Sequence, residues 1–136
     1  MRITITRPAG ICTQGRFKNF PVQEDRHLLT LCRYVEANAL RAGMVKHAEA
    51  WRWSSLWARL QAVSGGLLDE WPVDRPADWL EIVNAVAKTE ELEAVRASVK
   101  RGRPLGSPEW IARTAQRLGL EFTLRDRGRP TRIGNK

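Results

Sequence analysis

Residues 25–43 read DRHLLTLCRYVEANALRAG, and this stretch predicts the main helix of the chain. Its apolar residues recur at helical spacing, as is typical of an amphipathic helix with one buried face. Gly43 is placed to end the helix, because glycine readily adopts the left-handed conformation that follows many helices. We therefore expect a helix over Asp25–Ala42 with an apolar stripe made of Leu28, Leu31, Cys32, Val35, Ala39 and Ala42.

The polar side of the same helix carries Tyr34, the only tyrosine of the chain. A tyrosine among basic residues can attack a phosphodiester if cationic groups stabilise the phosphate. Arg41 and Arg33 are candidates for that role, and Asn38 is a candidate oxygen ligand for a metal ion. The alternative is a packing residue whose hydroxyl reaches the surface. At about 100° per residue, a group of polar side chains falls within about 80° on this side of the helix: His27, Thr30, Tyr34, Asn38 and Arg41.

The rest of the chain predicts further short helices and one extended segment. Residues 14–22 contain strand-favouring Phe17, Phe20 and Val22 and read as an edge strand. The six tryptophans are expected to be mostly core anchors, with stacking on unpaired bases as the alternative. The expected helices run from Ser54 or Ser55 to Leu60, from Pro76 to Ala87, from Glu90 (capped by Thr89) to Lys100 with Leu92, Val95 and Val99 inward, and from Ser107-Pro108-Glu109 to Gly119.

Composition and charge narrow the class of protein. The 136 residues suffice for one domain, or one small domain with an extension, and carry a net charge of +8. The charge is +5 over residues 1–47, −4 over 48–99 and +7 over 100–136. Such basic ends favour nucleic acid as partner, the alternative being a basic protein with no polyanion partner. No apolar run is long enough to span a membrane and no signal peptide is visible, so we expect a cytoplasmic protein with Cys12 and Cys32 as free thiols.

Several pieces of the sequence together resemble the REP-associated tyrosine transposases, single-tyrosine HUH enzymes of the IS200-like family. The resemblance covers roughly residues 13–130, and its pieces occur in the order found in the family. They are Gln14-Gly15-Arg16-Phe17-Lys18, Tyr34-Val35-Glu36-Ala37-Asn38-Ala39-Leu40-Arg41-Ala42-Gly43, Trp51-Arg52-Trp53-Ser54-Ser55, Gly102-Arg103-Pro104-Leu105-Gly106-Ser107, and Trp110 with Leu118-Gly119-Leu120.

The resemblance implies that Tyr34 attacks single-stranded or hairpin repeat DNA, forming a 5′-phosphotyrosine and freeing a 3′-hydroxyl. It also implies a divalent metal, Mg or Mn, held by a His-hydrophobic-His motif, with a further ligand one turn after the tyrosine, where Asn38 stands. The chain departs from the family in having Ala39 at a position that is usually proline. It also has no such histidine motif, since its two histidines are His27 and His47. We therefore expect a chain truncated at its N-terminus that binds no metal and is impaired in cleavage.

Two copies of Arg-Gly-Arg-Pro, at 101–104 and 127–130, resemble the core of an AT-hook. Such an extended segment enters a narrow A·T minor groove, where the potential is most negative. The first copy lies in an expected basic linker, Arg101–Gly106, where a solvated basic turn is the alternative to minor-groove binding. The expected DNA-binding residues are thus Arg16, Lys18, Arg33, Arg41, Arg101, Arg103, Arg127 and Arg129.

These observations predict a mainly α-helical chain. We expect residues 1–48 to be the remnant of an α+β ferredoxin-like HUH domain, one edge strand plus the tyrosine helix. A helical C-terminal region over 49–120 and a basic, disordered tail over 121–136 would follow. The expected function is DNA binding by a bacterial, nucleoid-associated protein of the transposase family, and the alternative is a non-catalytic regulatory module or a decayed remnant.

Overall fold

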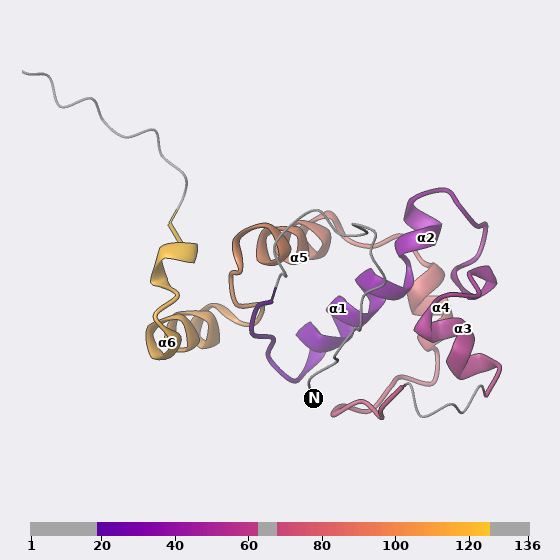
Figure 1. Cartoon of the computed structure of the whole chain (residues 1–136), viewed down its shortest axis with the longest axis horizontal. Coiled ribbons are helices and arrows are strands. Elements are labelled where there is room, and N and C mark those ends of the chain that lie inside the picture. The colour runs from indigo at the N-terminus through magenta and orange to yellow at the C-terminus, as the bar shows by residue number, and fades with distance from the viewer. Residues whose placement is uncertain (1–18, 63–67, 126–136) are drawn as a thin grey trace, which may run out of the picture.

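The computed structural model describes residues 19–62 and 68–125, and in these ranges the chain is mainly α-helical, as expected (Figure 1). Extended pairing within the described ranges is limited to one isolated parallel bridge, between Val22 and Leu105. The α-helices are α1 (Arg26–Glu36), α2 (Asn38–Arg41), α3 (Ser55–Leu60), α4 (Trp79–Asn84), α5 (Thr89–Arg101) and α6 (Pro108–Leu118), and two 3-10 helices are η1 (Ala48–Ala50) and η2 (Glu121–Thr123).

The stretch expected to form one helix is divided into α1 and α2, so that expectation is wrong. Ala37 lies between them with φ −82° and ψ 5°, outside the helical region. Asp25, which was expected to be the first helical residue, instead caps α1: its side chain accepts a hydrogen bond of 2.7 Å from the backbone N–H of His27. Gly43 ends α2 as predicted, with a φ of +69° that disfavours any residue with a Cβ.

The buried face of α1 also differs from the expected apolar stripe. Val35 is 58% exposed, whereas its neighbour Glu36 is only 3% exposed. Cys32 and Ala39 lie on the buried side as expected, and Leu29 and Leu40, which the stripe did not include, also pack against the core. That core is formed by Ala37, Ala48, Leu56, Trp79 and Val83. These residues come from both of the expected segments, 1–48 and 49–120.

Glu36 is buried because both of its carboxylate oxygens are hydrogen-bonded. Ser55 Oγ donates to Oε1 at 2.6 Å, and Trp79 Nε1 donates to Oε2 at 2.8 Å. A buried carboxylate is costly to desolvate unless such donors compensate for the lost water. Trp79 in turn meets Trp71 edge to face, with ring centroids 5.1 Å apart. Glu36 therefore joins the end of α1 to α3 and α4.

Helix α5 packs along α1, and α4 is shorter than the sequence indicates (Figure 1). The expected helix over Pro76–Ala87 is limited to Trp79–Asn84, because the chain becomes extended at Ala85, with ψ 155°. In α5, Val95 is buried as predicted, but Ser98 is buried instead of Val99, which is 37% exposed. Thr89 is the first residue of α5 rather than its cap.

The segment before α1 lies beside the segment before α6. The backbone N–H of Leu105 donates to Pro21 O, and that of Gln23 donates to Leu105 O, each at 2.9 Å. The Gln23 side chain adds an acceptor for the backbone N–H of Ser107, also at 2.9 Å. Of the edge strand expected over residues 14–22, the described part forms only the Val22 bridge, and residues 14–18 lie outside the described ranges.

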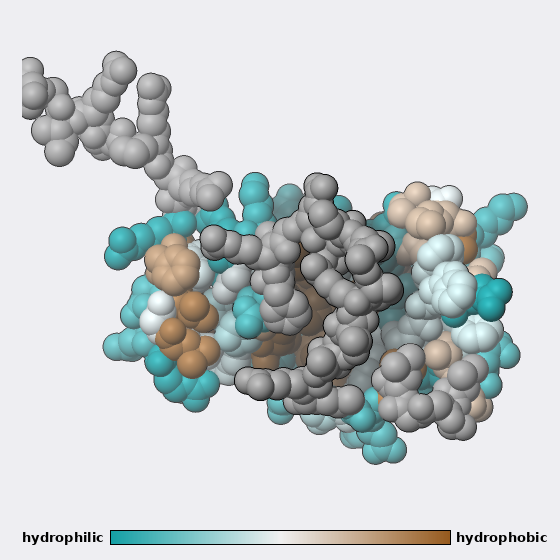
Figure 2. Space-filling model, in the orientation of Figure 1, coloured by the Kyte–Doolittle hydropathy of each residue, from teal (hydrophilic) through white to brown (hydrophobic). Residues whose placement is uncertain are grey.

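Helix α6 forms as its sequence predicts. The Ser107 hydroxyl caps it, Pro108 opens it, and Gly119 ends it with a φ of +65°. Beyond it, apolar side chains gather on the surface of α6 and η2 (Figure 2), where Leu118 is 50% and Phe122 66% exposed. Across residues 19–62 and 68–125, no helix combines the length and apolarity needed to cross a lipid bilayer.

Candidate functional site

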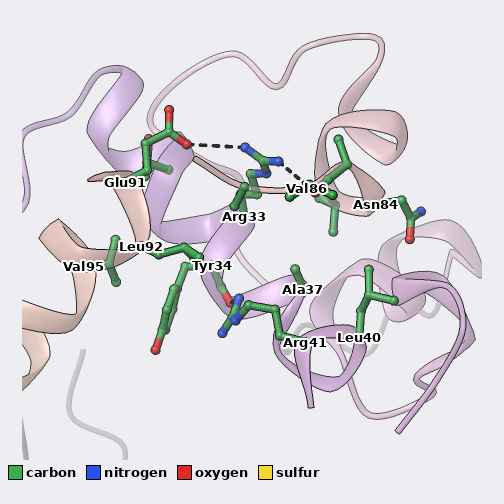
Figure 3. A pocket seen from close by; sticks show the side chains of 14 residues that line it. Arg33, Tyr34, Ala37, Leu40, Arg41, Asn84, Val86, Glu91, Leu92 and Val95 are labelled. Carbon is green, nitrogen blue, oxygen red and sulfur yellow. Dashed lines mark hydrogen bonds and ion pairs between the residues drawn. The ribbon is translucent and has the colours of Figure 1, made fainter. Parts of the chain in front are cut away.

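Tyr34 and Arg41 form a stacked pair at the junction of α1 and α2. The guanidinium carbon of Arg41 lies 4.0 Å from the centroid of the Tyr34 ring. Arg41 Nη1 donates to the backbone oxygen of Tyr34 at 2.8 Å, and Nη2 donates to Asn38 Oδ1 at 3.1 Å. Figure 3 shows the two side chains next to each other. The structure therefore brings together Tyr34, Asn38 and Arg41, which the helical spacing had placed on one side.

The Tyr34–Arg41 pair lines a cavity of about 340 Å³ between α1, the α4–α5 connection and α5 (Figure 3). Its inner wall is apolar, with Val83, Leu92 and Val95 among its lining residues. The Tyr34 ring and the Arg41 guanidinium thus place a planar aromatic surface and a positive charge beside an apolar hollow. A planar ligand group with an attached anion is the kind of partner that such an arrangement can bind.

Arg33 lines the same cavity but is bound to other partners. Its Nη1 lies 3.4 Å from Glu91 Oε2, and its Nη2 donates to the backbone oxygen of Ala85 at 2.9 Å. The expected second cationic group for a phosphate therefore carries an ion pair and holds the α4–α5 connection against α1. Of the two arginines proposed to flank Tyr34, Arg41 is the one that contacts its ring.

Asn38 was expected to offer its side-chain oxygen to a metal ion. In the structure that oxygen accepts a hydrogen bond from the Arg41 guanidinium, so it faces a cationic side chain. His27 lies elsewhere on α1, with Nδ1 2.7 Å from Asp25 Oδ1. Partial burial raises the pKa of Asp25, but the backbone N–H and ring of His27 outweigh it and bring the pKa below its usual value. Within the described residues, no three His, Cys, Asp or Glu side chains are grouped as metal ligands would be.

The basic linker expected over Arg101–Gly106 does connect α5 to α6, except that its first residue belongs to α5. Arg101 is the last residue of α5, and Gly102 ends the helix with a φ of +71°. Pro104 is fully buried and therefore cannot enter a DNA groove. Arg101 Nη1 donates to the backbone oxygen of Arg125 at 3.2 Å, and Arg103 lines a separate groove between α1, α5 and α6. Four expected DNA-binding residues lie outside the described ranges: Arg16, Lys18, Arg127 and Arg129.

The tryptophans divide into two kinds. Trp79 is 4% exposed and partly buried Trp71 packs against the same core, so two of the six tryptophans expected to be mostly core anchors lie in this core. Trp53 is 74% exposed, and the guanidinium carbon of Arg52 lies 4.7 Å from its ring centroid. Sequence reasoning did not single out this Arg-Trp pair. A signal was present, because the pair stands in a turn directly before the Ser54 cap rather than on an apolar helix face.

The sequence pieces that carry the family resemblance contact one another. Glu36 of the tyrosine segment accepts the hydrogen bond from Ser55 of the Trp-Arg-Trp-Ser-Ser segment. In the segment Gly102–Ser107, Gly106 packs so closely that an added Cβ would lie 2.5 Å from Trp110 Cε3. Two of the quoted pieces therefore meet at Glu36 and two others at Gly106, while Gln14–Lys18 lies outside the described ranges. No protein-family model matches the chain, and neither a curated protein nor a solved structure does so.

Proposed function

We propose that this chain is a DNA-binding member of the REP-associated tyrosine transposase family that holds single-stranded or hairpin repeat DNA at the Tyr34–Arg41 pair. In this proposal α1 and the Val22 segment are a remnant of the family's ferredoxin-like domain. The protein acts on nucleoid DNA in a bacterial cytoplasm. The observation that carries the proposal is the Arg41 guanidinium, stacked 4.0 Å from the Tyr34 ring centroid and fixed by two hydrogen bonds.

The fixed guanidinium suits a DNA phosphate for a physical reason. A guanidinium has five N–H donors, and the bonds to the Tyr34 backbone and to Asn38 use two of them. Because its position is already set, binding a phosphate costs little additional side-chain entropy. The adjacent aromatic ring offers a face on which a base or sugar can pack. The net charge of +8 adds a general attraction for a polyanion.

Binding without cleavage is the activity that this set of residues favours. A metal ion both activates the nucleophile and stabilises the phosphate in metal-dependent transfer. The 136 residues contain no His-hydrophobic-His motif, and the Asn38 oxygen is directed to Arg41. Arg41 alone polarises a phosphate but takes no proton from the Tyr34 hydroxyl. Tyr34 therefore serves as a contact surface in this chain. The proposed activity is that of a repurposed regulatory protein, which binds the DNA without cutting it.

The test is the affinity for a labelled hairpin repeat oligonucleotide, measured by fluorescence anisotropy at several salt concentrations. Arg41→Ala is expected to weaken binding about tenfold or more, as for the loss of a charged hydrogen bond. Arg41→Lys keeps the positive charge but loses the planar stack, so its affinity should lie between those of the wild type and Arg41→Ala. Arg96→Ala, which removes an exposed arginine from α5, is the matched control and should change affinity little. Wild-type affinity should fall steeply with salt.

Two further results bear on the proposal. Tyr34→Phe should leave the affinity unchanged, because it keeps the ring on which Arg41 stacks. No covalent protein–DNA adduct should form with Mg²⁺ or Mn²⁺. A Tyr34-dependent adduct would show that the chain cleaves DNA. Absent or salt-independent binding would refute DNA binding altogether and favour a protein-interaction role.

A further inference from the structure

A second aromatic–arginine pair lies on the other side of α2 from Tyr34. Trp53 is 74% exposed in the turn between η1 and α3, and the Arg52 guanidinium carbon lies 4.7 Å from its ring centroid. Val35 and Met44 are also exposed here, at 58% and 60%. Exposing a large aromatic ring together with neighbouring apolar side chains is unfavourable in water, and such patches mark binding surfaces.

Trp53, Val35 and Met44 line a groove with a cavity of about 340 Å³, and Arg52 is adjacent to it in the chain. Val35, Met44, Trp51 and Trp53 give it apolar and aromatic walls. Glu36 is the charged residue in its lining, and its two carboxylate oxygens already accept from Ser55 and Trp79. The groove therefore suits a flat, uncharged group better than a cation that needs a carboxylate.

The exposed charges beside the groove are basic, whereas the acidic Glu36 in its lining is buried, and this favours an anionic partner. The segment 44–53, which borders it, carries exposed Lys46 and Arg52 against one acidic residue, Glu49. The Glu49 carboxylate accepts a hydrogen bond from Asn84 Nδ2 at 2.8 Å, which lowers its pKa and ties it to α4. A second copy of this chain would bring the same basic segment against itself. A nucleotide combines a flat base, which suits the apolar and aromatic groove, with a phosphate, which suits the basic residues at its border.

We propose that Trp53 and Arg52 form a stacking platform for an unpaired base of single-stranded DNA, with Arg52 also contacting the adjacent phosphate. This inference rests on the proposed DNA binding and adds a second contact to it. Asn38 connects the two places, because it lines this groove and bonds to Arg41 of the first pair. A single strand that crosses α2 thus meets Tyr34–Arg41 on one side and Trp53–Arg52 on the other.

The experiment compares two labelled hairpins of the same stem, one blunt and one with a short single-stranded tail. Affinities are measured by anisotropy at one salt concentration for the wild type, Trp53→Ala, Trp53→Phe and Phe122→Ala. Phe122→Ala is the matched control, because Phe122 is another exposed aromatic, 66% exposed on η2. Trp53→Ala should weaken binding of the tailed hairpin about tenfold or more, as expected for the loss of one base–aromatic stack.

The remaining variants and the blunt hairpin define what supports the inference. Trp53→Phe should retain most of the affinity for the tail, and Phe122→Ala should bind like the wild type. The blunt hairpin should bind all four proteins alike. Because Trp53 is largely exposed, the thermal unfolding midpoint should hardly change, and circular dichroism checks this for each variant.

Three outcomes would overturn the inference, and they are distinguishable. If Trp53→Ala affects neither hairpin, or both equally, the platform is wrong while DNA binding stands. If the wild type binds neither hairpin, the proposed function fails and the platform fails with it. If sedimentation equilibrium shows a dimer that Trp53→Ala dissociates, the groove belongs to an interface between two copies.

Discussion

Two regions of the molecule are held together by different means. The tyrosine region (α1 to α4 with η1) is joined by side chains far apart in the sequence, since Glu36 bonds to Ser55, 19 residues away, and to Trp79, 43 residues away. The C-terminal region (residues 104–125) is joined to the rest by backbone hydrogen bonds at Leu105 and by close packing at Gly106. The first arrangement depends on the presence of the Glu36 carboxylate, and the second depends on the absence of a side chain at Gly106.

This difference determines how each region holds its exposed side chains in place. In the tyrosine region, the buried Glu36 fixes the end of α1 directly before Ala37, where α1 gives way to α2. Arg41 is held against Tyr34 by its own hydrogen bonds, and the Glu36 contacts hold the end of α1 that supplies the Tyr34 acceptor. In the C-terminal region, the bridge holds the start of α6 while Leu118 and Phe122 stay exposed. Disturbing the two regions should thus have separable consequences.

The largest effect is expected from removing the Glu36 carboxylate. Glu36→Ala leaves the buried Trp79 Nε1 and the Ser55 hydroxyl without their acceptors, and each buried unsatisfied group costs about 1–3 kcal/mol. We expect the free energy of unfolding, measured with urea, to fall by about 3 kcal/mol. Glu49→Ala, which removes a carboxylate with one side-chain partner, is the control and should cost about 1 kcal/mol. Equal losses in the two variants would contradict the central role given to Glu36.

A smaller effect is expected from adding one methyl group in the C-terminal region. In Gly106→Ala the new Cβ would lie 2.5 Å from Trp110 Cε3 and 2.8 Å from Gln23 Oε1, so the neighbours must move. Overpacking of this kind costs about 1–3 kcal/mol, and we expect about 2 kcal/mol in the free energy of unfolding. Hydrogen exchange should accelerate at the amides of Leu105 and Gln23, which the Gly106 contact supports.

Gly119→Ala separates this packing effect from backbone strain. Gly119 has a φ of +65°, but nothing lies within 4 Å of a Cβ added there. The substitution should cost about 1 kcal/mol through the left-handed backbone and leave the exchange of Leu105 and Gln23 unchanged. If Gly119→Ala accelerates their exchange as much as Gly106→Ala does, close packing at Gly106 is not what joins the two segments.

The sequence predicts well the features that depend on neighbouring residues. The cap by Ser54, the start of α6 at Ser107-Pro108 and the helix ends at Gly43 and Gly119 all appear as expected. Each is decided within one or two helical turns, where capping and backbone preference dominate. The same holds for the candidate site, because spacings of four and seven residues keep Tyr34, Asn38 and Arg41 on one side.

The features that the sequence does not predict depend on distant partners. Glu36 looks like a surface residue until Ser55 and Trp79 supply its hydrogen bonds, and that burial turns Val35 outward. Arg33 looks available to DNA until Glu91, 58 residues away, is placed beside it. Helical periodicity treats every acidic or basic residue as exposed. It therefore misplaces those whose burial is compensated by hydrogen bonds to a residue far away in the sequence.

The reactivity of Cys32 tests whether the inner face of α1 is closed. Burial and the nearby Glu36 carboxylate raise the pKa of the Cys32 thiol to about 11 from 9.0, against the opposing charge of Arg59. In a Cys12→Ser background, iodoacetamide should alkylate Cys32 at pH 8 about 100-fold more slowly than an ordinary thiol, as mass spectrometry can measure, because the thiolate is correspondingly scarce. The pKa of Cys32 is higher in the folded chain than in the unfolded chain, so folding favours the neutral thiol. The contribution of this thiol to stability is therefore complete below pH 9.0 and is lost as the pH rises towards 11. Adding Glu36→Ala should accelerate alkylation, whereas adding Gly106→Ala should not, since the tyrosine region and not the C-terminal region encloses this thiol.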